Sequence, residues 1–130
     1  MKTLAIIVLI LGLASLVMGV IFVINSGSAR TEVADGIAPV TLADLDGRYD
    51  QVKTAQMQVA QQEGAAIQAG NPSTTYVWLT LQRTSLGLAR SSVGIANLTM
   101  ILGYLNLVIG IALVIVSLGM MRQDKAPAAA

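Results

Sequence analysis

Two apolar stretches without a charged residue constrain the fold of this chain more than any other feature. The first runs from Leu4 to Ile24 and contains one polar side chain, Ser15. The second runs from Ile101 to Met121 and is followed directly by Arg122. As a helix, each stretch would rise about 31 Å, which matches the hydrocarbon core of a bilayer. The sequence therefore predicts an all-α membrane protein with two transmembrane helices, over residues 1–24 and about 101–121.

The composition agrees with this fold class and narrows the possible functions. Of the 130 residues, 55% are hydrophobic and 12% are charged, whereas soluble domains have about 45–50% and about 25%. Histidine and cysteine are absent, which removes the commonest catalytic bases, thiol nucleophiles and metal ligands. The net charge is +1 and no basic run occurs. We therefore expect no catalytic residue, no cofactor, no metal site and no nucleic-acid partner.

The charges at the two ends predict the orientation in the membrane. Lys2, Arg122 and Lys125 flank the spans, so the positive-inside rule places both termini in the cytoplasm and residues of about 25–100 outside the plasma (inner) membrane. We expect the first span to stay uncleaved, because the apolar core of a signal peptide has only about 7–15 residues. A cleaved signal peptide is the alternative, since small residues follow the span over 26–29.

The segment between the spans predicts a linker over residues 25–41 and then an extracytoplasmic antiparallel helical hairpin. Thr41 and Asp44 have the spacing of a capped helix start, and Gly70 followed by Pro72 gives a helix stop, so the first hairpin helix is expected over 42–70. Ser73 can cap a second helix. No proline follows before Met121, so this helix is expected over 73–121, continuous with the second span, before a short cytoplasmic tail at 122–130.

A seven-residue apolar repeat predicts how the two hairpin helices pair. Large apolar residues recur at this spacing along the second helix, as in a coiled-coil seam. With the tip of the hairpin near Pro72, Val52 is expected opposite Val93, and Val59 opposite Leu86.

Small residues also recur every seven positions, and they predict a helix-packing seam between the two spans. Small side chains let transmembrane helices approach closely and gain dispersion contacts. In antiparallel alignment Gly12 meets Gly110, and Gly19 meets Gly103. The alternative is a chance alignment, because glycine and alanine are frequent in membrane helices. The residues of the predicted seam are Ala5, Gly12, Gly19, Ala96, Gly103, Gly110 and Ser117.

A second apolar line along the long helix predicts contacts with a partner. The line continues from the hairpin part of this helix into its membrane-spanning part. The first hairpin helix and the first span together cannot cover all of it. Either a second copy completes a four-helix bundle or a different membrane subunit covers the line; the alternative is a broad face packed within one chain. Tyr76 and Trp78 near the hairpin tip, and Asn106 inside the span, are further candidates, Asn106 for a hydrogen bond to another helix. The candidate partner contacts are Tyr76, Trp78, Leu81, Leu88, Ile95 and Asn106.

These patterns favour a non-enzymatic accessory, scaffold or assembly subunit of a membrane complex, acting through helix packing. In architecture alone, the two spans with a helical hairpin between them are similar to the ligand-binding half of bacterial chemoreceptors. That resemblance implies an alternative, an extracytoplasmic sensor or modulator that signals laterally to a partner. A homo-oligomeric pore is a third alternative, which would need a polar stripe through the membrane.

Overall fold

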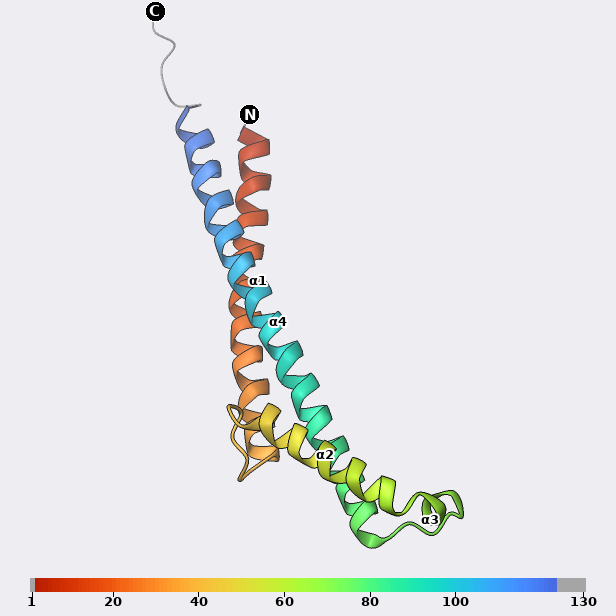
Figure 1. Ribbon diagram of the computed structural model, residues 1–130. Helices are drawn as coiled ribbons and strands as arrows, with labels where there is room; N and C mark the ends of the chain where they lie inside the picture. The colour runs from red at the N-terminus through yellow and green to blue at the C-terminus, as the bar shows by residue number, and fades with distance from the viewer. Residues whose placement is uncertain (1, 124–130) are drawn as a thin grey trace, which may run out of the picture. The chain divides into compact units, whose positions relative to one another are not determined.

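The computed structural model describes residues 2–123, and all regular secondary structure in that range is helical (Figure 1). The helices are α1 (Lys2–Gly36), α2 (Leu45–Gln62), α3 (Gly64–Gln68) and α4 (Thr74–Gln123). Helices α1 and α4 are both long and apolar enough to cross a membrane. The all-helical class and the two long apolar helices are thus confirmed. Of the predicted tail over 122–130, residues 124–130 lie outside the described part of the chain.

The chain divides into two compact units, and α1 and α4 each contribute to both of them. The first unit comprises Met1–Ser28 and Ala96–Ala130, and so contains the two apolar stretches. The second unit comprises Ala29–Ile95, with the end of α1, the whole of α2 and α3, and the beginning of α4.

Helix α1 is longer than the apolar stretch that begins it. Residues 25–36 are helical, so the prediction of a linker over 25–41 was wrong for this part. The reason is that no proline interrupts the segment before Pro39, and that the Ser26 hydroxyl is satisfied inside the helix by the Val23 carbonyl, at 3.0 Å. Polarity alone therefore did not end the helix at the end of the apolar stretch.

The predicted capping pair forms, but α2 begins three residues after Leu42, the predicted start. The Thr41 hydroxyl donates to the Asp44 carboxylate at 2.6 Å, and the Asp44 N–H donates to Thr41 Oγ1 at 3.3 Å. These bonds close a turn over residues 42–44, and Asp44 becomes the N-cap of α2.

The predicted helix over 42–70 is interrupted at Glu63, which separates α2 from the five-residue α3. Gly64 follows directly, and glycine has a low helix propensity. The Glu63 carboxylate instead accepts a hydrogen bond from the Ser73 N–H at 3.1 Å, ahead of α4. Gly70 has a φ of +75°, and its N–H donates to the Ile67 carbonyl while Asn71 N–H donates to the Ala66 carbonyl. This Schellman motif confirms the glycine stop predicted at Gly70.

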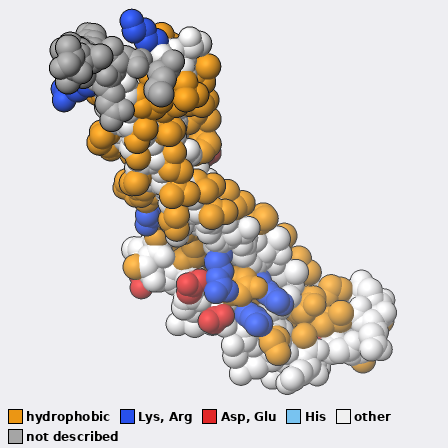
Figure 2. All heavy atoms as spheres, turned by 90° about the horizontal axis from the view of Figure 1, so that it is seen from above, with side chains coloured by type: hydrophobic (Ala, Val, Ile, Leu, Met, Phe, Trp, Pro, Cys, Tyr) orange, Lys and Arg blue, Asp and Glu red, His pale blue; other side chains and the backbone are white. Residues whose placement is uncertain are grey.

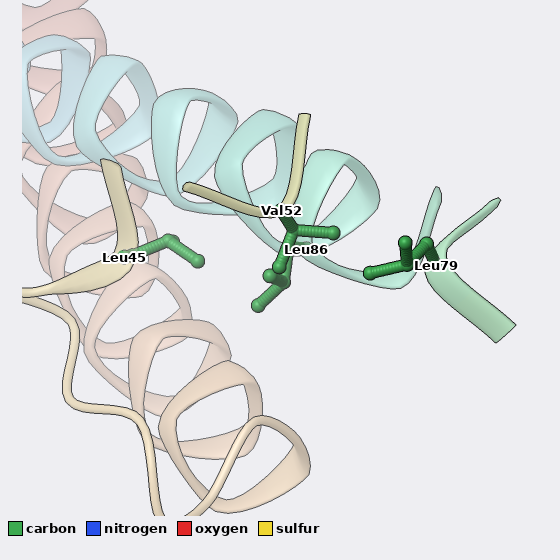
Figure 3. Close-up of a cluster of buried hydrophobic side chains, with 5 residues drawn as sticks. Leu45, Val52, Leu79 and Leu86 are labelled. Carbon is green, nitrogen blue, oxygen red and sulfur yellow. The ribbon is translucent and has the colours of Figure 1, made fainter. Parts of the chain in front are cut away.

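The core of the second unit is a cluster of aliphatic side chains from α2 and α4 (Figure 3). Val33, Ile37, Tyr49, Ala55, Val59 and Val93 pack around it, partly buried. On α4 the buried positions follow the expected seven-residue spacing. The buried members are Leu45, Val52, Leu79, Leu86 and Ala89.

The register between α2 and α4 differs from the predicted one. Arg90 Nε lies 2.7 Å from Asp46 Oδ1, and Gln56 Nε2 donates to Thr80 Oγ1 at 2.8 Å. In the predicted register Asp46 would face Thr99 instead. The observed partners lie about two and a half helical turns earlier on α4. The cause is the connection: residues 63–73 leave the paired helices, so the end of α2 lies level with the first turns of α4.

Candidate functional site

The seven residues of the predicted helix-packing seam are all buried in the first unit. On α1 they are the buried positions Ala5, Gly12 and Gly19, followed by Ser26. On α4 the buried positions of this unit are Ala96, Gly103, Gly110 and Ser117. The structure therefore gathers every small residue of the seam on one side of each helix.

The four glycines of the seam allow contacts that other residues would prevent. A Cβ atom added at Gly110 would lie 2.8 Å from the Gly12 carbonyl oxygen, and one added at Gly19 would lie 2.8 Å from the Gly103 carbonyl oxygen. Real Cβ atoms essentially never approach other heavy atoms within 3.0 Å. The structure thus pairs Gly12 with Gly110 and Gly19 with Gly103, and α1 meets α4 at backbone contact distance.

Asn106 joins α4 to α1 beside the seam. Ser15 Oγ donates to the Asn106 carbonyl oxygen at 2.9 Å and lies 3.3 Å from Oδ1, while Asn106 Nδ2 donates to the Leu102 carbonyl at 3.1 Å. Both polar atoms of the Asn106 side chain therefore have partners within the first unit. The hydroxyl of Ser117, fully buried in the seam, has no hydrogen-bond partner among the described residues.

The remaining candidate partner contacts lie in the second unit, on two sides of α4. Leu81, Leu88 and Ile95 expose 65%, 65% and 64% of their surfaces, and Trp78 exposes 56%. Helical geometry places these four residues within one sector of about 100°, which we call the exposed α4 line. Tyr76 is half-buried and lies on the opposite side of the helix. Trp78 therefore belongs to an open surface, and Tyr76 does not share it.

The charged residues of this part of α4 point towards α2, away from the exposed α4 line. Arg83 Nη1 donates to Gln56 Oε1 at 2.7 Å. Arg90 pairs with Asp46 and lies 5.6 Å from the centre of the Tyr49 ring. Sequence reasoning missed these contacts, although the seven-residue spacing of Arg83 and Arg90 places both on the side of the apolar repeat. Figure 2 shows cationic and acidic side chains gathered side by side next to an apolar surface.

The described residues contain no group of three or more carboxylates, histidines or cysteines that could hold a metal ion. Two shallow surface hollows at α2 share Gly47 and Gln51 in their lining, and Asp50 lines one of them. No protein family, curated protein or solved structure matches this chain.

Proposed function

We propose that this chain is a small, non-enzymatic integral membrane protein that acts through helix packing as an accessory, scaffold or assembly subunit of a membrane complex. One observation carries the proposal: the exposed α4 line, where Trp78, Leu81, Leu88 and Ile95 are each more than half exposed. A row of large apolar side chains left open on a protein surface marks an interaction site. Helix packing is the mechanism that such a surface supports.

The surface of the first unit supports the membrane placement. Large apolar side chains cover the outside of both helices; Ile10, Ile101, Val108 and Ile115 are each at least 60% exposed. Hydrocarbon solvates such a surface, and both helices satisfy their backbone polar groups internally. Lys2 and Arg122 at the ends favour both termini in the cytoplasm of the plasma (inner) membrane. The second unit is then extracytoplasmic, with α2 and the start of α4 as an antiparallel helical hairpin.

A pore is less well supported than a packing subunit. Asn106 is the strongest hydrogen-bonding side chain inside the second apolar stretch, but it bonds to Leu102 and Ser15 within the first unit. Its amide nitrogen is therefore bonded within α4 and its side-chain oxygen accepts from α1, so it offers little to line a water-filled path. A sensor that signals laterally would use the same packing surfaces, so the composition of the native particle distinguishes it from a subunit.

The test is to purify the protein from its native membrane through a C-terminal tag in mild detergent and to measure the mass and polypeptide composition of the particle. We expect a second polypeptide in a fixed ratio to this chain. The double variant Leu81→Asn with Leu88→Asn should lower the mass of the particle, whereas Met57→Asn, at a 51% exposed position on α2, should leave it unchanged. A particle that contains this chain alone would contradict the proposal and favour the sensor or the pore.

The orientation has its own test, because the chain contains no cysteine. In intact cells a membrane-impermeant maleimide should label the variant Trp78→Cys and should label Ala129→Cys only after the cells are opened. Labelling of Ala129→Cys from outside would reverse the proposed orientation.

A further inference from the structure

We propose that the exposed α4 line is covered by the same line of a second copy of this chain, with the two α4 helices parallel around a twofold axis. The inference rests on the membrane placement in the proposed function, because two copies inserted in the same direction present their α4 helices in parallel.

The residue pattern along the line fits a parallel pair of helices. At 100° per residue, Leu81, Leu88 and Ile95 lie within about 40° of one another. Ser85 and Ser92 lie between them on the same face, and both are exposed. In a parallel twofold pair each residue meets its own copy. Layers of large apolar residues would then alternate with layers of small hydroxyl residues, at the spacing of a two-stranded coiled coil.

The charges favour a second copy over a different protein. In a twofold contact of parallel helices, any charged residue on the face lies near its own copy and is repelled by it. Between Thr74 and Ile95, α4 carries two charged residues, Arg83 and Arg90, and both are engaged with residues of α2 on the other side of the helix. A face that binds a different protein is under no such restriction, because opposite charges on the partner can neutralise it.

The exposed α4 line alone is smaller than a standard interface, but its residue spacing continues beyond it. The four residues of the line offer on the order of 500 Å² per copy, compared with ~800 Å² per partner in a standard interface. The same seven-residue spacing continues in the first unit at Leu102, Ile109 and Val116, which are also exposed. Hydrocarbon cannot cover Leu81, which precedes Ile101 by 20 residues, or about 30 Å of helix. Leu81 is therefore open to water or to a protein partner, and a second copy would remove it from water.

Disulfide cross-linking in native membranes tests the inference. We expect single variants Leu81→Cys, Leu88→Cys and Ile95→Cys each to form a dimer of twice 13.5 kDa on oxidation. All three positions must react with themselves, because an antiparallel pair would bring at most one of them together with its copy. Two control variants should stay monomeric. The first is Gly94→Cys, whose side chain would meet open space and lies about 100° around α4 from Ile95. The second is Met57→Cys, at an exposed position on α2.

The outcomes separate this inference from the proposed function. Cross-links from the exposed α4 line to another polypeptide only, or no cross-link at any of the three positions, would overturn the second-copy contact. Self-cross-linking at all three positions, in a particle that lacks any other polypeptide, would support the second copy while contradicting the accessory-subunit proposal. The variant Leu81→Asn with Leu88→Asn should also halve the particle mass without changing its helical circular dichroism.

Discussion

Gly110→Ala is the substitution that tests the packing of α1 against α4 most directly. The new Cβ atom would lie 2.7 Å from Leu16 Cγ and 2.8 Å from the Gly12 carbonyl oxygen. Ordinary van der Waals contact begins near 3.4 Å, so the two backbones would have to separate locally by about 0.6 Å, the difference between 3.4 and 2.8 Å. Leu16 can move its flexible end, but the Gly12 carbonyl is part of the α1 backbone.

The expected cost follows from two opposing effects. Overpacking a close-packed contact costs about 1–3 kcal/mol, whereas replacing glycine by alanine inside a helix gains roughly 0.5–1 kcal/mol. Gly119→Ala is the matched control, because Gly119 lies in the same helix and the same unit with nothing within 4 Å of its added Cβ atom. The gain in helix propensity is common to both variants and cancels. We therefore expect Gly110→Ala to be less stable than Gly119→Ala by about 1–3 kcal/mol.

The assay is a titration with sodium dodecyl sulfate in mixed micelles, followed by energy transfer between two dyes. Thr3→Cys and Met121→Cys place the dyes near the ends of α1 and α4 in the first unit, and no native cysteine competes for the label. Energy transfer falls when the two helices separate, and the detergent concentration at the midpoint of this transition measures how stable their packing is. Equal stability of Gly110→Ala and Gly119→Ala would refute the close backbone contact.

Three further substitutions test polar groups. Ser117→Ala removes a buried hydroxyl that has no partner among the described residues. The same titration should therefore find the variant at least as stable as the original protein. A lower stability would show that the hydroxyl is hydrogen-bonded. Ser15→Ala removes the bonds to Asn106 and should cost about 0.6 kcal/mol, the average for interhelical bonds in membranes, and an unchanged midpoint would count against them. Gln56→Leu leaves Arg83 without its hydrogen-bond acceptor and should lower the free energy of unfolding by about 1–3 kcal/mol. Thermal unfolding followed by Trp78 fluorescence measures this change, and an unshifted transition would contradict it.

The sequence predicted the helical class well, and it predicted the register of α2 on α4 poorly, for a physical reason. A seven-residue repeat of large apolar residues looks the same after a shift of seven residues. Val59 can face Leu86 or Leu79, and the apolar pattern does not distinguish the two. The polar pairs Gln56 with Thr80 and Asp46 with Arg90 do distinguish them, and so does the length of the connection between the helices. Neither could be used without knowing that α2 ends at Gln62.

The small-residue repeat is more informative, because a glycine contact cannot be shifted without cost. Moving Gly12 by seven residues along α4 still places it opposite a small residue, but Lys2 and Arg122 would then no longer lie at the same depth. The spacing and the end charges together select one alignment, the one in which Gly12 meets Gly110. The exposed α4 line, in contrast, shows only which surface is open. The absence of charged residues on that face is the separate observation that favours a second copy as its partner.

The residues that α4 buries differ in size between the two units. In the second unit α4 buries Leu79 and Leu86 together with Ala89, and in the first it buries only small residues, Ala96, Gly103, Gly110 and Ser117. In water, burial of large apolar side chains drives packing, so a core gains from leucine. In hydrocarbon, a leucine side chain gains little from leaving lipid for protein, and stability comes from the close approach that small residues allow. The loss of large buried residues on α4 after Leu86 therefore agrees with the proposed placement, in which the first unit lies in the membrane and the second outside it.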